Sequence, residues 1–541
     1  MELASYVVLA ILSVLVAGKQ FHGPYEVMRR FLVPLVGVTA LVWWWFTGAS
    51  LNLSLGGVWL MAGMVSWWII TTLMSPHKHL GMGDLSVWIG TVTFVVFGFT
   101  DVNTTGLMIV MVGVVANCVY AIVQHEFKYE PFWKLKDDLT HAPVGFVGNT
   151  NMLGNFLTIN FFLALYLANH GYWWFMIVCA LIVYTIWLTR CKGSYVGIVT
   201  GIVTTAIMGV DEPVYTFVVL TVTFILLMGL LKRHNFINAY NKATAKDRLR
   251  YLQVAWEQIK HSPIFGVGFD GLKCNEPFLQ RDINIRMNGK FLDPNNYAQP
   301  YPQKCHNDYV QMVCDVGIPG LVMYVGLIVL ALLSPADPTL KGGLVAALTT
   351  GLFLHNLHLT PTSIWTWFVL FLCLHSYDAV GVSVPWYVVG LLATILLATY
   401  RDVINATLSS FWYQQYRLTK DVTNLHKALA YTPYDGHVLT HLGGAHQIAR
   451  EFLDASDYAT KAVCWFDGAI RIWELCLNVA KSQLTLGGLL LAEHYAKQSL
   501  SFNPNYTDGE TFLTQIQTIL QRGYQVRRTP EVKNESKTNG A

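Results

Sequence analysis

A series of long apolar runs is the feature that most restricts the fold of this chain. A helix needs roughly 20 apolar residues, at a rise of about 1.5 Å each, to cross about 30 Å of hydrocarbon. Because each run is apolar on all sides and a backbone in lipid needs internal hydrogen bonds, helices are expected. The runs cover residues 4–17, 30–47, 57–74, 85–100, 106–125, 152–168, 172–189, 194–210, 214–231, 309–333, 342–358, 363–377 and 384–400. The sequence therefore predicts an all-α, polytopic transmembrane bundle of about 12–13 helices.

The composition agrees with a membrane-embedded protein. Of 541 residues, 53% are hydrophobic and 13% are charged, and 18 Trp and 26 Tyr are available for the membrane interfaces. The first run has Glu2 rather than a basic segment before it, which favours an anchoring helix over a cleaved signal peptide. Residues 1–400 are expected to form the transmembrane domain, interrupted by one long polar loop over 232–307.

The composition changes from about Arg401 to that of a soluble helical domain. Two similar strings, Ala428–Asp435 and Ala496–Tyr506, are separated by about two tetratricopeptide periods of roughly 34 residues each. Helical repeats of this type are predicted over 401–525, with an irregular helical bundle as the alternative. The polar residues 526–541 lack periodicity and are expected to be a disordered tail.

The polar loop contains two features that suggest chemistry. His306 and Asn307 close the loop directly before an apolar run, where an ionisable side chain reaches both water and lipid headgroups. Earlier in the loop, Arg248 begins an amphipathic segment that ends in a proline and the turn Gly266-Val-Gly268. The structural alternatives are a histidine that bonds a loop carbonyl and an arginine on a solvated surface.

Two further motifs stand at the starts of apolar runs. Gly148, Asn149 and Asn151 offer close backbone approach and polar groups at the membrane interface, although small residues there often only pack. Arg190 and Lys192 lie in a tight turn between two apolar runs. There they either bind a phosphate or anchor the helices by extending to the interface.

In their order and context these segments resemble the O-antigen ligase and polymerase family of bacterial polytopic membrane glycosyltransferases. The resemblance covers roughly residues 100–380 and rests on the segments named above, followed by Gly317 and Gly320. It implies that the 1–400 domain is a glycosyltransferase whose extracytoplasmic loop transfers a glycan from a polyprenyl-pyrophosphate carrier to an acceptor hydroxyl. It also implies that no metal, nucleotide or other cofactor takes part. Some relatives carry a similar C-terminal extension.

The resemblance assigns roles to single residues. His306 corresponds to the family's catalytic histidine, and Arg248, Lys192 and Arg190 are expected to bind the donor pyrophosphate. The supporting residues are Asn307, Gly317, Gly320, Asn149, Asn151, Gly266 and Gly268. An arginine is usual in the family at the position of Lys192, and a lysine cannot form a two-pronged contact to phosphate.

The chemistry of these residue types fits such a reaction. A neutral imidazole, with an ordinary pKa of about 6.5, is suited to take the proton of an acceptor hydroxyl. Fixed cations stabilise the charge that develops on the departing pyrophosphate. The resemblance implies a direct displacement with inversion at the anomeric carbon.

Several functions stay open on the sequence. The acceptor is a lipid A core sugar in a ligase, another lipid-linked repeat in a polymerase, or a Ser or Thr hydroxyl in a protein O-oligosaccharyltransferase. A lipid-linked glycan flippase is the rival of another class, although the predicted helices carry almost no ionisable residues. A third alternative is a membrane-anchored scaffold whose repeats bind a protein partner. The sequence contains no phosphate-binding loop motif and no clear metal-ligand cluster, and no nucleic-acid partner is expected.

The charge of the loops does not decide the orientation by itself. Basic residues gather after the odd-numbered helices, which the positive-inside rule would place in the cytoplasm, whereas a pyrophosphate site needs the same residues. The four runs after the loop return the chain to the loop's side of the membrane. We expect a multi-pass protein of the bacterial inner membrane, with the loop and the repeats both extracytoplasmic.

Cys274 and Cys305 lie within the polar loop, whereas most of the nine cysteines lie in apolar segments. A disulfide between them would close a loop of roughly 30 residues and stabilise it by about 3–4 kcal/mol in the chain-entropy model. Two free thiols are the alternative, because the sequence does not report the distance between the two Cα atoms.

Overall fold

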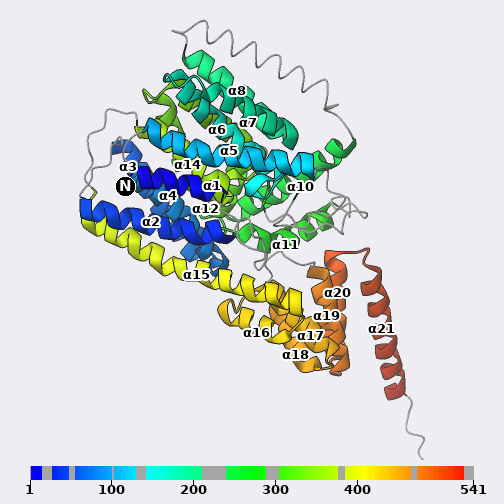
Figure 1. Ribbon diagram of the computed structural model, residues 1–541. Coiled ribbons are helices and arrows are strands. Elements are labelled where there is room, and N and C mark those ends of the chain that lie inside the picture. The colour runs from blue at the N-terminus through cyan, green and yellow to red at the C-terminus, as the bar shows by residue number, and fades with distance from the viewer. Residues whose placement is uncertain are drawn as a thin grey trace, which may run out of the picture. The chain divides into compact units, whose positions relative to one another are not determined.

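A computed structural model describes residues 2–14, 27–47, 55–99, 103–129, 142–209, 239–287, 304–375, 384–464 and 472–528. Every regular element in these residues is a helix, which confirms the all-α prediction (Figure 1). The chain divides into two compact units, which we call the membrane unit (Met1–Asn275 with Pro302–Lys420) and the C-terminal unit (Glu276–Tyr301 with Asp421–Ala541).

The helices of the membrane unit follow the predicted apolar runs. They are α1 (Glu2–Val14), α2 (Val27–Thr47), α3 (Leu55–Met74), α4 (Lys78–Gly98), α5 (Thr104–Phe127), η1 (Gly145–Val147), α6 (Thr150–Asn169), α7 (Phe175–Thr189), α8 (Lys192–Met208), α12 (Asp308–Leu333), α13 (Pro338–Gly351), η2 (Asn356–His358), α14 (Thr360–His375) and α15 (Trp386–Thr419). The predicted run 214–231 lies outside the described residues. Within the described ranges, seven helices are long and apolar enough to cross a membrane, namely α2, α3, α4, α5, α6, α12 and α15. The shorter apolar helices α1, α7 and α8 accompany them, as expected for a polytopic membrane protein.

Glycines let neighbouring helices of the membrane unit approach closely. The helix α8 lies beside α6 and α13. The helix α2 lies beside α4 and α15 (Figure 1). Where α8 meets α13, a Cβ atom on Gly201 would stand 2.5 Å from Gly342 O, and one on Gly342 would stand 2.6 Å from Gly201 O. Close van der Waals packing of this kind holds helices together in lipid, where burial of apolar surface gives little force. Both positions therefore require glycine.

The helix α12 is interrupted at Gly317, whose φ of 74° and ψ of 178° are not helical. The break frees backbone groups, and these pair with the polar loop and with α3. The four hydrogen bonds are Val267 N to Cys314 O (2.8 Å), Gly268 N to Asp315 O (2.8 Å), Ile318 N to Pro263 O (2.9 Å) and Trp67 Nε1 to Val316 O (2.7 Å). Irregular backbone at membrane depth is tolerated where protein groups satisfy it in this way. The loop turn around Gly266 is thereby fastened to a membrane helix.

Alanine at Gly317 is expected to destabilise the membrane unit by about 3 kcal/mol or more, because the backbone conformation strongly disfavours a side chain and the site has no room for one. A Cβ atom at this position would stand 1.8 Å from Ile264 O. The thermal midpoint of the purified variant in detergent measures the effect. The control is Gly83→Ala on α4, where a Cβ atom meets nothing within 4 Å. A midpoint for Gly317→Ala that equals the control would contradict the prediction.

The polar loop is largely helical in its described part. It contributes α10 (Ala239–His261) and α11 (Gly271–Arg286) to the structure. The sequence predicts a domain boundary at residue 400, but α15 continues through it and ends at Thr419. The boundary between the two units follows at 420 and 421, and part of α11 belongs to the C-terminal unit.

The C-terminal unit consists of helices that pack mainly on their neighbours in the sequence. Its described helices after residue 420 are α16 (Val422–Tyr431), α17 (Gly436–Ile448), α18 (Phe452–Cys464), α19 (Ile472–Thr485), α20 (Leu489–Phe502) and α21 (Thr507–Arg528). The two similar strings of the sequence each span a helix end and the turn that follows, after α16 and after α20. Within this unit, Arg281 of α11 lies 5.0 Å over the ring of Phe502. The helix α21 continues to residue 528, and the rest of the predicted tail lies outside the described residues.

Candidate functional site

His306 is held in a turn directly before α12. Its φ of 57° is left-handed, a conformation that costs a residue other than glycine about 1–3 kcal/mol and that is frequent at functional sites. The next residue, Asn307, caps α12. Its Oδ1 accepts a hydrogen bond from Val310 N (3.0 Å), and its Nδ2 donates one to Leu352 O (3.1 Å). Asn307 therefore supports His306, because its side chain fastens the turn that precedes α12 both to α12 and to the end of α13.

The His306 ring lies close to two other rings. Its centroid is 5.9 Å from that of Tyr251 on α10 and 4.9 Å from that of His355 after α13. His306 Nδ1 is closed to solvent and has no hydrogen-bond partner among the described residues. Burial, with a further contribution from the charge of Arg248, lowers the pKa of His306 to about 4. The imidazole is therefore neutral at neutral pH and able to accept a proton.

Arg248 lies on α10, and its charge acts on three segments. The guanidinium interacts electrostatically with His306, with His355 and with the thiol of Cys191, which lies between α7 and α8. The structure thus brings the loop arginine near both His306 and the predicted basic turn. Such an arrangement of one fixed cation and one neutral imidazole is suited to an anionic leaving group and an attacking hydroxyl.

The basic turn and the predicted asparagine segment adjoin each other. Arg190 is exposed in a left-handed conformation at the end of α7, and Lys192 is half-buried at the start of α8. Between them, Cys191 Sγ donates a hydrogen bond to Asn151 O (3.7 Å). Asn149 caps α6, since its Oδ1 accepts a hydrogen bond from Asn151 N (2.9 Å). The two asparagines hold the start of α6 against the turn, and their contacts in the structure are structural.

The predicted glycines also have structural contacts. Gly266, Gly268 and Gly317 have positive φ and form the junction between the loop and α12. At Gly320 a Cβ atom would stand 2.4 Å from Val316 Cγ2, so this glycine leaves room for a side chain one turn earlier. All four support the site by allowing close packing rather than by offering chemical groups.

Of the two alternatives for Cys274 and Cys305, the structure has the second, with both residues buried and no disulfide between them. Cys305 Sγ instead donates a hydrogen bond to Asn307 O (3.3 Å). Cys305 also packs in an apolar cluster with Cys314 of α12 and Ala255 of α10. Its thiol is therefore used in packing the turn that precedes His306.

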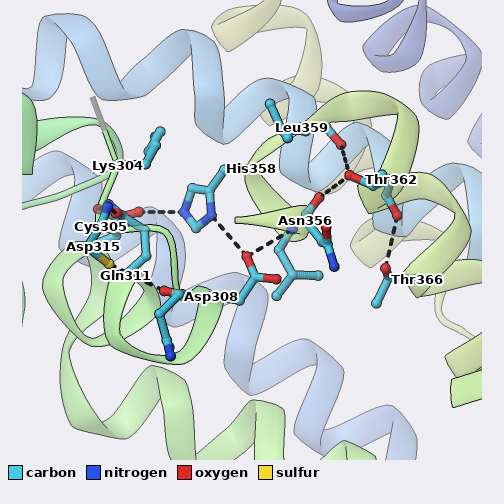
Figure 2. Close-up of polar contacts among 12 residues, drawn as sticks. Lys304, Cys305, Asp308, Gln311, Asp315, Asn356, His358, Leu359, Thr362 and Thr366 are labelled. Atoms are coloured by element: carbon cyan, nitrogen blue, oxygen red, sulfur yellow. Dashed lines mark hydrogen bonds and ion pairs between the residues drawn. The ribbon is translucent and has the colours of Figure 1, made fainter. Parts of the chain in front are cut away.

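A buried polar network beside His306 was missing from the sequence predictions (Figure 2). His358 Nε2 lies 2.7 Å from Asp315 Oδ2, and His358 Nδ1 lies 3.6 Å from Asp308 Oδ1. Gln311 Nε2 donates to Asp315 Oδ1 (2.9 Å), and Leu357 N donates to Asp308 Oδ1 (3.0 Å). The side chains of His358 and Asp315 are 1% and 0% exposed. Burial of a polar group is costly unless it has a partner, and here each side chain is the partner of the other. The sequence did contain a signal for this network, because spacings of three and four residues put Asp308, Gln311 and Asp315 on one face of the helix.

Asn356 connects this network to the basic turn. Asn155 Nδ2 donates a hydrogen bond to Asn356 Oδ1 (2.8 Å), and Ser194 Oγ donates one to Asn155 Oδ1 (3.0 Å). Asn356 Nδ2 donates to Thr350 Oγ1 (2.7 Å). The segment 355–358 is therefore fixed to α6, α8, α12 and α13 together.

Ionisable residues inside the helices are more frequent than we expected. Asp84 of α4 lies close to a cation, since its Oδ2 is 3.8 Å from Nζ of Lys304. Lys304 itself lies between helices, as does Asp270, whose Oδ1 is 2.5 Å from the same Nζ. Asp84, Asp308 and Asp315 are all buried in helices that qualify as membrane spans. The expectation that the helices carry almost no ionisable residues was wrong, because one or two carboxylates do not change the apolar character of a long run.

Among the described residues, one group of side chains has a geometry that could hold a metal ion. It consists of His446, Glu451 and Asp454 in the C-terminal unit, whose ligand atoms all lie within 4.8 Å of one another. The group does not belong to the site around His306.

Comparison with known proteins gives a family match over the central part of the chain. Residues 176–325 match the family model described as O-antigen ligase. No curated protein matches the chain. The matched residues run from α7 to α12 and include Arg190, Lys192, Arg248 and His306. The match identifies an O-antigen ligase family domain in this membrane protein.

Proposed function

We propose that this protein transfers a glycan from a polyprenyl-pyrophosphate carrier to an acceptor hydroxyl, without a metal ion. The arrangement that supports the proposal most is the buried imidazole of His306 in the turn before α12, next to the rings of Tyr251 and His355. Burial and the charge of Arg248 keep this imidazole neutral, because both lower its pKa. A base and a cation in one site match the two needs of the reaction, removal of a proton and stabilisation of an anion.

The reaction is a single displacement. The acceptor oxygen attacks the anomeric carbon, its proton passes to His306, and the bond from the anomeric carbon to the phosphate oxygen breaks. The electron pair of that bond stays on the pyrophosphate, next to Arg248, Lys192 and Arg190. Attack opposite the leaving group inverts the anomeric configuration.

A transfer assay with the purified protein in liposomes tests the proposal. The donor is a polyprenyl pyrophosphate with a labelled glycan, and the acceptors are a lipid A core, a second lipid-linked repeat and a Ser/Thr peptide in separate reactions. We expect a labelled product with one of the three acceptors and release of polyprenyl pyrophosphate. Absence of transfer with all three would reject the proposal.

A flippase for lipid-linked glycans is the second candidate. The buried pairing of His358 with Asp308 and Asp315 favours it, since ionisable residues inside a membrane bundle often mark a transport or proton pathway. The same liposomes distinguish the two functions. A flippase would move a fluorescent lipid-linked glycan between the leaflets and form no glycosylated acceptor.

Alanine at Lys192 is expected to lower the transfer rate about tenfold or more, because a cation next to the pyrophosphate stabilises the developing charge. Arginine at Lys192 is expected to retain activity, since it keeps the charge and can form a two-pronged contact. Initial rates at a fixed donor concentration measure both effects. Equal rates for wild type and the two variants would show that the turn only anchors its helices.

The loop and the C-terminal unit are expected to be extracytoplasmic. Single cysteines at the exposed residues His261 and Thr514 should react with a membrane-impermeant thiol reagent in intact spheroplasts. The eight cysteines whose side chains the structure describes are all buried, so their contribution to the native background is low. The control is Trp173→Cys, at an exposed residue between α6 and α7, which should react only after permeabilisation. Labelling of only one of the two test positions would contradict the shared compartment.

A further inference from the structure

His355 is the second imidazole of the candidate site. Its ring centroid lies 4.9 Å from that of His306, with an angle of 64° between the two ring planes. His355 Nδ1 and His306 Nδ1 are both closed to solvent and have no hydrogen-bond partner among the described residues. A buried polar group without a partner costs about 1–3 kcal/mol. Two such groups on adjacent rings indicate a bound group that supplies their partners.

The position of His355 is fixed by residues on both sides of it. The next residue, Asn356, bonds to Asn155 of α6, and His358 lies between Asp308 and Asp315 of α12 (Figure 2). On the other side, Leu352 O accepts the hydrogen bond from Asn307. A reactive group held by locked neighbours needs no rearrangement to meet its substrate. His358, Asp308 and Asp315 therefore act as positioning residues for His355.

The two imidazoles offer complementary hydrogen-bonding groups. Burial lowers the pKa of His355 well below its ordinary value, and the charges of His306, His358, Lys304 and Arg248 lower it further. Both rings are therefore neutral at neutral pH, and a neutral imidazole has one N–H donor and one acceptor nitrogen. An attacking hydroxyl needs a hydrogen-bond acceptor that takes its proton. A hydrogen-bond donor to one lone pair of the hydroxyl oxygen also orients the other lone pair for attack.

We propose that His355 is a second catalytic residue, which binds the acceptor hydroxyl together with His306. The inference rests on the proposed transfer reaction. His306 takes the proton while the N–H of His355 donates to one lone pair of the acceptor oxygen. The remaining lone pair forms the bond to the anomeric carbon, and the pyrophosphate leaves with the electrons of the broken bond. His355 itself ends the cycle unchanged.

Kinetics of His355 variants test this role. Phenylalanine keeps a planar ring without nitrogen, and glutamine keeps an N–H donor. We expect H355F to lower kcat/KM for the acceptor about 100-fold, with donor affinity unchanged within about twofold and an unchanged thermal midpoint. H355Q should recover at least about tenfold over H355F. The matched control is H375F at the end of α14, which should behave as wild type.

Several outcomes would overturn the inference. H355F with wild-type kinetics would do so, as would an equal loss of acceptor and donor affinity or equal activity of H355F and H355Q. If H355F does not accumulate, H355A assayed with added imidazole decides the question. Rescue of transfer by imidazole supports the role, and a folded H355A that imidazole does not rescue contradicts it. If wild type transfers glycan and H355F transfers it equally well, only the role of His355 is rejected. If wild type transfers no glycan, the proposed function is rejected.

Discussion

Alanine in place of His306 is expected to lower kcat for glycan transfer about 100- to 10,000-fold, because the reaction loses its general base. Donor affinity should change little, since the neutral imidazole carries no charge toward the pyrophosphate. Steady-state kinetics in liposomes measure both quantities. The control is His261→Ala, which removes an exposed histidine at the end of α10. Transfer by His306→Ala at the wild-type rate would refute the role of His306.

The pH dependence of kcat/KM tests the role of His306 as a base in a second way. A base works in its unprotonated form, and the pKa of His306 is lowered to about 4 by burial and by Arg248. We therefore expect kcat/KM to stay level from about pH 8 to pH 5 and to fall about tenfold per pH unit below about pH 4. Removing the charge of Arg248 should move this acid limb to higher pH, because the imidazolium is then less disfavoured. A wild-type limb at about pH 6.5, the ordinary value for histidine, would contradict the expected environment.

Alanine in place of Arg248 is expected to lower kcat/KM for the donor about 100- to 1,000-fold, the usual effect of removing a group that stabilises developing negative charge. Lysine at the same position should lose less, because it keeps the charge but not the planar two-pronged contact. Binding of the donor, measured separately from turnover, should weaken as well.

The control for Arg248 lies on the same helix. Lys260 is 52% exposed and pairs with Glu257 across 3.1 Å, an interaction worth about 1 kcal/mol at most. Lys260→Ala is therefore expected to keep wild-type transfer. If Arg248→Ala also kept it, Arg248 would be an ordinary loop arginine and the donor site would lie elsewhere.

The sequence alone was sufficient for the helices and for the order of the motifs. Apolar runs are a local property, so the runs at 57–74 and 309–333 predicted α3 and α12 with nearly correct ends. The resemblance carried by Arg248 and His306 led to the family that the comparison with known proteins then matched over residues 176–325. A chemically distinctive residue beside a membrane helix can be recognised without knowledge of its neighbours.

The contacts between distant segments were not predictable from the sequence. Gly317 was recognised in the sequence as a supporting residue. The reason why a glycine is needed there is that Ile264 O passes close by, and this depends on how the loop packs against α12. Likewise, the cysteine at 305 looked available for a disulfide until its thiol was found bonded to the carbonyl of the Asn307 turn.

The sequence by itself determined an all-helical membrane chain with one polar loop, an arginine and a boundary histidine. Only the tertiary structure joined His355 to His306 and set His358 between Asp308 and Asp315, across more than 40 positions of the chain. The physical reason is that helix formation follows from the periodicity of neighbouring residues, whereas a buried polar contact between helices depends on their packing. A lone carboxylate or histidine in an apolar run has no local signal that names its partner.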